Sequence, residues 1–347
     1  MALVALAPVT HRSPTPLRPP LPGWRRTATG VALALPLAGA LGLQACRPSS
    51  PPEVIAADGV LCDLSQRLAA ADLQVRCLLQ PGDDPHQFRL TPQQSRDLSA
   101  APLALINGYG LTPALSDQSR AVAVAEQAVP GSPVVGHDAS HGAGHGAGHD
   151  HGDRDPHVWH DPIQASAMVR LVAQHLEQLK PAARSRIAAR ALQMTTVLGE
   201  LDRWNRQQLA TIPASRPLAT GHRAFISLAR AYNLEELPLV DASSSSDTLR
   251  PQAFQAVVAQ LKRDRVPMLF PEQLPASKAL QRISSLSGVP LAPAPLVADG
   301  LAPSSDGAGS LVATLTDNTC LIVNGLKGRC DRASQQALVR QWQAIGR

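Results

Sequence analysis

The chain has 347 residues, and 44% of them are hydrophobic, which is enough for one large domain or two medium domains with true cores and excludes a disordered protein. Its formal net charge is +5, but the first 45 residues hold four arginines and no lysine or acidic residue, so the rest of the chain carries only +1. A nearly neutral body with 3% aromatic residues lacks the basic face and the stacking platforms that nucleic-acid binding needs, and we exclude that class.

Residues 1–45 are predicted to be a signal peptide. A pair of arginines precedes an uncharged apolar run at 30–43, which is shorter than the roughly 20 residues that cross a bilayer. Leu-Gln-Ala-Cys at 43–46 follows at the end of this run and resembles the box that contains the lipidated cysteine of bacterial lipoproteins, so Cys46 is a candidate lipidation site. Cleavage without lipidation is the alternative. Both predict a periplasmic or otherwise extracytoplasmic protein, and residues 46–53 then form a Pro/Ser tether, which a lipid would anchor to the membrane.

The cysteines fit export to an oxidising compartment. With Cys46 assigned to the lipid, four of the five cysteines remain for two disulfides, and four cysteines allow three pairings. We favour the pairing of the nearest neighbours in sequence; buried free thiols are the alternative. The predicted disulfides are therefore Cys62 with Cys77 and Cys320 with Cys330.

Residues 54–180 are predicted to form an N-terminal α/β lobe. The apolar run at 54–56 leads into a helix-like segment, and LQVRCLL and PLALING are further runs of strand length, separated by a helix-like segment at 92–99. Alternating strands and helices are typical of a mostly parallel sheet.

Within this lobe, residues 137–153 are a low-complexity segment of Gly, Ala, His, Asp and one Ser, which cannot bury a core and is predicted to be a loop. Imidazoles without fixed geometry suit weak and labile metal binding; a solvated spacer is the alternative. The candidate auxiliary metal-binding residues of this loop are His137, His141, His145, His149 and His151.

A long helix is predicted to link this lobe to a second one. In residues 181–212, apolar residues recur at steps of three and four, and a helix of about 28 residues would reach roughly 40 Å, longer than one small domain is wide. Residues 213–347 then show a second series of strand-like and helix-like segments, including the run PLVA at 295–298. The predicted fold class is thus α/β, with two lobes, each containing a mostly parallel sheet, joined by one long helix.

Two Asp-Pro-His tripeptides stand between strand-like and helix-like segments, and they make His86 and His157 candidate metal ligands. Proline fixes φ and so gives each histidine a defined point of departure. Asp84 and Asp155 could accept the second imidazole proton or cap a helix, and His160 could share a helical face with His157, so these three are candidates for supporting the ligands.

His222 and Asp299 also follow strand-like runs, and ligands of open α/β sheets gather at the carboxyl ends of strands. Three imidazoles and one carboxylate would form a tetrahedral zinc shell. Taken singly, each residue could instead be a turn histidine or a helix-capping acid. Affinity for zinc should fall as the histidines protonate below their ordinary pKa of about 6.5.

The segments DPHQF, DPHVWHDP, TGHRAF and VADGLAP resemble the solute-binding proteins of bacterial zinc and manganese ABC importers, the ZnuA-like or TroA-like family. The similarity runs in the same order across most of residues 53–347 and includes NGYGL and FPEQ. The resemblance implies two α/β lobes bridged by a rigid helix, a metal bound in the cleft between them, and delivery to a membrane permease driven by a cytoplasmic ATPase. We also expect the protein to be a monomer.

By position, the resemblance assigns His86, His157, His222 and Asp299 as the metal ligands. His160 stands where the family usually has an apolar residue and stays outside this set. Members that prefer manganese tend to carry a carboxylate at the position of His222, so three nitrogens and a histidine-rich loop favour Zn²⁺ over Mn²⁺.

Two other functions compete with metal import. An exported zinc hydrolase is disfavoured because the His-x-His-x-Asp-His pattern that begins at His149 fails at Arg154, and because the chain has no His-Glu-x-x-His. We therefore predict that the protein is not an enzyme. A zinc storage or chaperone protein, in which the histidine-rich loop is the functional part, predicts several weak sites and no tight one.

Overall fold

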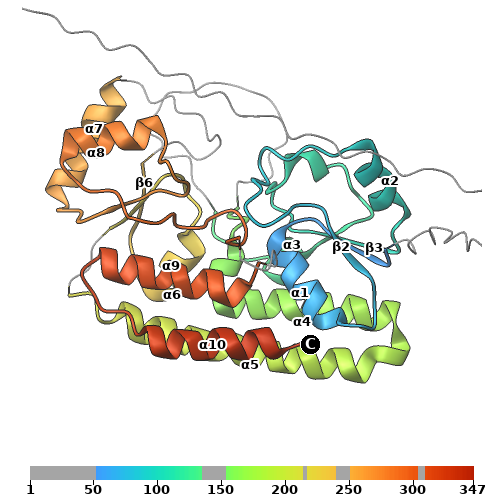
Figure 1. Ribbon diagram of the computed structural model, residues 1–347. Coiled ribbons are helices and arrows are strands. Elements are labelled where there is room, and N and C mark those ends of the chain that lie inside the picture. Colours follow the sequence, from blue (N-terminus) through green and yellow to red (C-terminus); the bar gives the residue numbers. More distant parts are fainter. Residues whose placement is uncertain (1–51, 135–153, 214–216, 240–250, 304–308) are drawn as a thin grey trace, which may run out of the picture. The chain divides into compact units, whose positions relative to one another are not determined.

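The computed structural model describes residues 52–134, 154–213, 217–239, 251–303 and 309–347 (Figure 1). The predicted signal peptide, Cys46 and the five candidate histidines of the loop 137–153 lie outside the described residues. Residues 50–347 form one compact unit. Among the described residues, none of the helices combines the length and the apolar character that crossing a membrane requires.

The N-terminal sheet is parallel throughout, as expected. Its strands lie in the order β2-β1-β3-β4, and each pairs in parallel with its neighbour; they are β1 (Val54–Ala56), β2 (Val75–Cys77), β3 (Leu103–Ile106) and β4 (Val122–Ala123). Three α-helices belong to this part of the chain: α1 (Gly59–Ala69), α2 (Pro92–Ala100) and the short α3 (Val124–Ala128). The side chain of Asp58 caps α1, and Thr91 forms a capping box with Gln94 at α2, so polar residues fix where both helices begin.

The C-terminal sheet is also parallel, in the order β6-β5-β7. Its strands are β5 (Leu218–Thr220), β6 (Glu236–Pro238) and β7 (Leu269–Phe270), and its helices are α6 (Ile226–Tyr232), α7 (Pro251–Arg263) and α8 (Lys278–Ser287). The run at 295–298 is not a strand, although its sequence suggested one. The side chain of Asn318 bonds both the amide and the carbonyl of Val297, at 3.0 and 2.7 Å, and these groups are then not free for a ladder.

The predicted long helix is α5 (Arg184–Leu209), whose 26 residues span about 39 Å. Before it, α4 (Pro162–Leu179) ends at Leu179, and the 3₁₀ turn Pro181–Ala183 reverses the chain, so that α4 packs along α5 (Figure 1). Two further helices complete the chain, α9 (Leu311–Gly325) and α10 (Arg332–Ala344), and both contact α5. Two further 3₁₀ helices in the described part of the chain lie at Pro113–Leu115 and Val158–His160.

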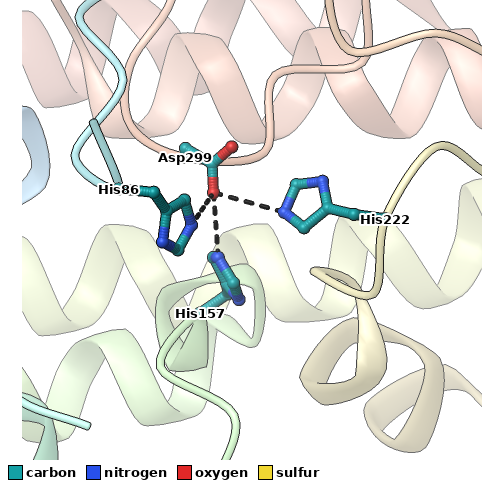
Figure 2. A group of neighbouring side chains, drawn as sticks. All are labelled: His86, His157, His222 and Asp299. Carbon is teal, nitrogen blue, oxygen red and sulfur yellow. Dashed lines mark hydrogen bonds and ion pairs between the residues drawn. The ribbon is translucent and has the colours of Figure 1, made fainter. Parts of the chain in front are cut away.

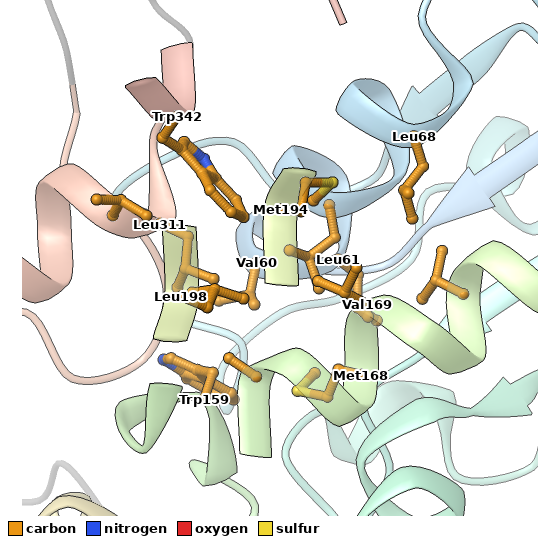
Figure 3. Packing of buried hydrophobic residues seen from close by; sticks show 14 of the residues in the cluster. Val60, Leu61, Leu68, Trp159, Met168, Val169, Met194, Leu198, Leu311 and Trp342 are labelled. Atoms are coloured by element: carbon orange, nitrogen blue, oxygen red, sulfur yellow. The ribbon is translucent and has the colours of Figure 1, made fainter. Parts of the chain in front are cut away.

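The largest hydrophobic core joins segments from both ends of the chain. Figure 3 shows Leu61 of α1, Met168 of α4, Leu198 of α5 and Leu311 of α9 packed in one cluster, together with Trp342 of α10. Buried Asp63 adds polar links to this packing: its carboxylate accepts hydrogen bonds from Arg67 Nε (2.7 Å), the Leu311 amide (2.9 Å) and Trp342 Nε1 (2.8 Å). The C-terminal helices are therefore tied to α1.

The four described cysteines form two disulfides, Cys62–Cys77 and Cys320–Cys330. The first joins α1 to β2, and the second joins α9 to the turn before α10. These are the pairs that proximity in sequence favoured. Both agree with a protein that folds in an oxidising compartment.

Candidate metal centre

Three histidines and one aspartate from four separate segments converge on one point. One potential ligand atom from each of His86, His157, His222 and Asp299 lies within 4.8 Å of the others (Figure 2). His86 follows β2, His157 precedes the 3₁₀ helix Val158–His160, His222 follows β5, and Asp299 ends the irregular run after β7. The structure thus brings together all four residues that the sequence named as candidate ligands.

The carboxylate of Asp299 is the meeting point of the three imidazoles. Its Oδ1 lies 3.0 Å from Nε2 of His86, 2.9 Å from Nε2 of His157 and 3.4 Å from Nε2 of His222. Burial alone would raise the pKa of Asp299, but its contacts with His157, His222 and His86 hold that pKa well below the usual range. The site therefore combines three nitrogen donors with an ionised oxygen donor, the set that a tetrahedral zinc site uses.

His157 is held by a buried carboxylate. Its Nδ1 donates to Asp155 Oδ1 at 3.0 Å, while Ser227 of α6 donates to Asp155 Oδ2 at 2.6 Å. This pairing leaves Nε2 as the nitrogen that faces Asp299 and could bind a metal. Burial lowers the pKa of His157, but the hydrogen bonds to Asp155 and Asp299 outweigh that effect and raise the pKa to about 9.

His222 has a matching partner in Glu272, which follows β7. Glu272 accepts from His222 Nδ1 at 2.7 Å and from the His222 amide at 3.0 Å. Burial lowers the pKa of His222, but the contacts with Asp299 and Glu272 raise it to about 11. Gly221 permits this approach, because a Cβ on that residue would lie 2.8 Å from Glu272 Oε2. The helix α6 begins at Ile226, and carboxylates of Glu272 and Glu236 accept from the amides of His222 and Phe225 that precede it.

His86 is the exposed member of the group. Its side chain is 36% exposed, compared with 3% for His157 and 19% for His222. The predicted partner Asp84 accepts from the His86 amide at 2.8 Å, so it fixes the turn. A cavity of about 360 Å³ opens beside the imidazole and is lined by His86, Gln87, Phe88, Arg89, Pro113 and Ala114. Of the three imidazoles, that of His86 is therefore the most accessible to solvent.

His160 lies outside the group of four. It is fully buried, and its Nε2 is 3.0 Å from the carbonyl oxygen of Ala298, the residue before Asp299. Burial, reinforced by the neighbouring His157, lowers the pKa of His160 to about 4. The side chain is thus neutral at pH 7 and bonds backbone.

The NGYGL segment at 107–111 holds the backbone next to His157 in place. Asn107 donates from its side-chain amide to the carbonyl of Pro156 at 2.8 Å, and its own carbonyl accepts from the amide of Ala125. Gly108 has φ of +91°, and a Cβ there would lie 2.7 Å from a carbon of Glu126. The glycine is required for this turn, which in turn fixes the backbone that carries His157.

Sequence reasoning missed the roles of Glu272, Ser227 and Asn107. Glu272 had a positional signal, because it follows β7 at the same end of the sheet from which His222 departs. Ser227 had none, because it reaches Asp155 across 72 residues of sequence and from the other lobe.

Comparison of the sequence with known proteins finds a matching family model and relatives that align over most of the chain. The model of a family described as zinc-uptake complex component A, periplasmic, matches residues 54–325. The zinc-binding protein TroA of Treponema pallidum is 25% identical over 298 residues, which cover 83% of this chain and 92% of TroA. The manganese ABC transporter substrate-binding lipoprotein PsaA of Streptococcus pneumoniae is 22% identical over 303 residues, which cover 85% of this chain and 97% of PsaA.

Solved structures share the fold. The periplasmic zinc-binding protein TroA from Treponema pallidum matches with a TM-score of 0.69 and 26% identity, over 79% of this chain and 99% of TroA. Fe(III)-bound YtgA from Chlamydia trachomatis also matches with a TM-score of 0.69, at 22% identity, over 80% of this chain and 99% of YtgA. These matches confirm the predicted fold of two α/β lobes joined by a long helix.

Proposed function

This chain belongs to the family of the periplasmic zinc-uptake complex component A, and on that premise we propose that it captures zinc outside the cytoplasmic membrane and delivers it to an ABC-type permease driven by a cytoplasmic ATPase. Members of the family are metal-binding proteins of transporters and not enzymes, as the sequence predicted. The observation that carries the proposal is the convergence of three imidazoles and one carboxylate on a single point.

The donor set favours zinc among the metals named for the relatives. TroA is named for zinc, PsaA for manganese, and YtgA was solved with Fe(III). Manganese suits carboxylate and carbonyl oxygens, whereas imidazole suits zinc. The third nitrogen, from His222, is therefore the feature that argues against manganese.

Capture then requires loss of protons at the Nε2 atoms. A histidine binds a metal through an unprotonated nitrogen, so the Nε2 protons that face Asp299 must leave as the ion enters. Asp155 and Glu272 keep the Nδ1 protons of His157 and His222 and hold both rings in place. His86, the exposed ligand, would close the shell last and open it first.

Two further parts of the proposal concern residues outside the described ones. The histidines of 137–153 would collect zinc weakly and raise its local concentration near the tight site. A lipid on Cys46 would keep the protein at the membrane, close to the permease.

A zinc titration against a competing chelator tests the proposal, using the exported protein stripped of metal, a variant lacking 137–153, and His157→Ala. We expect one tight zinc site that survives the deletion and is lost in His157→Ala. We also expect Mn²⁺ to bind this site more weakly than Zn²⁺. Several similar weak sites that disappear with the loop would favour the storage protein instead. Equal affinity for Mn²⁺ and Zn²⁺ would refute the assignment of the metal.

A further inference from the structure

The side chain of His160 links the two lobes beside the candidate metal centre. It belongs to the 3₁₀ helix Val158–His160, which follows the ligand His157, but its side chain contacts residues of the C-terminal lobe. Its Nε2 lies 3.0 Å from the carbonyl oxygen of Ala298, and its ring centroid lies 4.6 Å from that of Phe225. A carbonyl oxygen only accepts, so Nε2 must carry the hydrogen and donate it.

The second ring nitrogen of His160 is left unpaired while Nε2 bonds Ala298. Its Nδ1 is buried and has no hydrogen-bond partner among the residues that the structure describes. Leaving a buried polar atom unpaired is unfavourable, and an apolar side chain of similar size would avoid the loss. A histidine at this position is therefore explained better by what Nε2 bonds than by its packing.

The bond acts on the segment that carries Asp299. Within the C-terminal lobe, the Leu296 amide donates to Pro271, and Asn318 bonds both backbone groups of Val297. Beyond Asp299, Leu301 packs into the core cluster that contains α1 and α4. Packing of this kind is not directional, whereas a hydrogen bond fixes the orientation of its acceptor. The Ala298 carbonyl belongs to the peptide unit from which Asp299 departs, so the bond from His160 orients the backbone that carries this carboxylate.

We propose that His160 is a positioning residue for Asp299: its hydrogen bond to Ala298 aligns the carboxylate of the C-terminal lobe with His86 and His157 of the N-terminal lobe before the metal arrives. The proposal rests on the proposed metal-binding function. It implies that the two lobes share a fixed geometry at the site that does not depend on the ion. Part of the ordering of the ligands is then complete in advance, which strengthens binding.

Three variants separate the hydrogen bond from the packing. His160→Phe keeps an aromatic ring against Phe225 but has no donor, and His160→Gln keeps a donor of similar reach. His175→Phe is the control, because that histidine lies near the far end of α4, roughly 20 Å along the helix from Pro162. Each variant is stripped of metal and compared with wild type for zinc affinity, for release of zinc to a chelator, and for hydrogen exchange of residues 296–302 without metal.

We expect His160→Phe to weaken zinc binding roughly 10- to 100-fold, the usual effect of removing a partner that orients a metal ligand, and to speed zinc release. In the metal-free protein, exchange at 296–302 should rise roughly 2- to 12-fold, the equivalent of one hydrogen bond. His160→Gln should recover most of both effects, and His175→Phe should show neither.

Unchanged affinity and unchanged exchange in His160→Phe would overturn the proposal. So would equal loss of melting temperature with and without zinc at unchanged affinity, because that result describes a residue that only stabilises the fold. If wild type itself binds no zinc tightly, the proposed function fails, and the exchange measurement without metal still decides whether His160 positions the Asp299 segment.

Discussion

Zinc binding should release about two protons per ion even above neutral pH, because His157 and His222 have raised pKa values of about 9 and about 11. At pH 8 both rings are protonated, and zinc must displace both Nε2 protons, which gives roughly 1.9 protons. Two histidines with ordinary pKa values near 6.5 would together release fewer than about 0.1 at this pH. The sequence alone placed the loss of affinity below about pH 6.5; the structure moves it to higher pH.

Isothermal titration calorimetry at pH 8 in weakly chelating buffers of different ionisation enthalpy measures this number directly. The slope of the apparent enthalpy against the buffer enthalpy is the number of protons released. Affinity should also increase by up to roughly 100-fold between pH 7 and pH 8. Glu272→Gln removes the charge that helps to hold the proton on His222 and should reduce the slope. A slope near zero in wild type would refute the raised pKa values and the shared hydrogen-bonding role of Asp299.

The remaining predictions concern a glycine and a buried acid. Gly221→Ala should weaken zinc binding roughly 10- to 100-fold in a chelator competition, because the new Cβ displaces the end of the Glu272 side chain that holds His222. The melting temperature of the metal-free protein should change little. Gly199→Ala is the control and should bind zinc as wild type does, because a Cβ at that position meets open space. Asp63→Ala should lower the free energy of unfolding in urea by about 3 to 5 kcal/mol, because it leaves the Leu311 amide, Trp342 Nε1 and the partly buried Arg67 without their acceptor. Exposed Asp317→Ala should cost less than about 1 kcal/mol, and equal losses would show that Asp63 does not tie α10 to α1.

The candidate ligands could be named from the sequence because His86 and His157 stand in Asp-Pro-His tripeptides between strand-like and helix-like segments, and because His222 and Asp299 follow strand-like runs. The turn residues around them are local: proline and aspartate precede His86 and His157 directly, and their effect on the backbone extends over two or three residues. Parallel strands were recognisable for the same reason, since their apolar runs are continuous. What the sequence predicted well is thus what depends on neighbours in the chain.

The supporting contacts could not be predicted because they join distant segments. Glu272 lies 50 residues from His222, and Ala298 lies 138 residues from His160. Glu272 follows a strand-like run, but its sequence does not show which histidine it meets, and nothing local distinguishes the Ala298 carbonyl from other carbonyls. Only the arrangement of the two sheets around the long helix makes these residues partners. The run at 295–298 failed as a strand for a similar reason, since Asn318 of α9 takes the backbone groups of Val297.

The charges around the candidate site are suited to a dication. The carboxylates of Asp155, Glu272 and Asp299 face His157 and His222, whose raised pKa values keep both rings cationic at pH 7. A doubly charged ion that displaces one proton from each ring replaces two positive charges with two, so the net charge of this largely buried group stays the same. The carboxylates behind the rings then remain hydrogen-bonded by Nδ1, and no buried charge loses its partner. After the same exchange, a monovalent ion would lower the net charge of the group by one and a trivalent ion would raise it by one. We therefore expect a divalent ion to bind with the smallest change of buried charge, whether that ion is zinc or manganese.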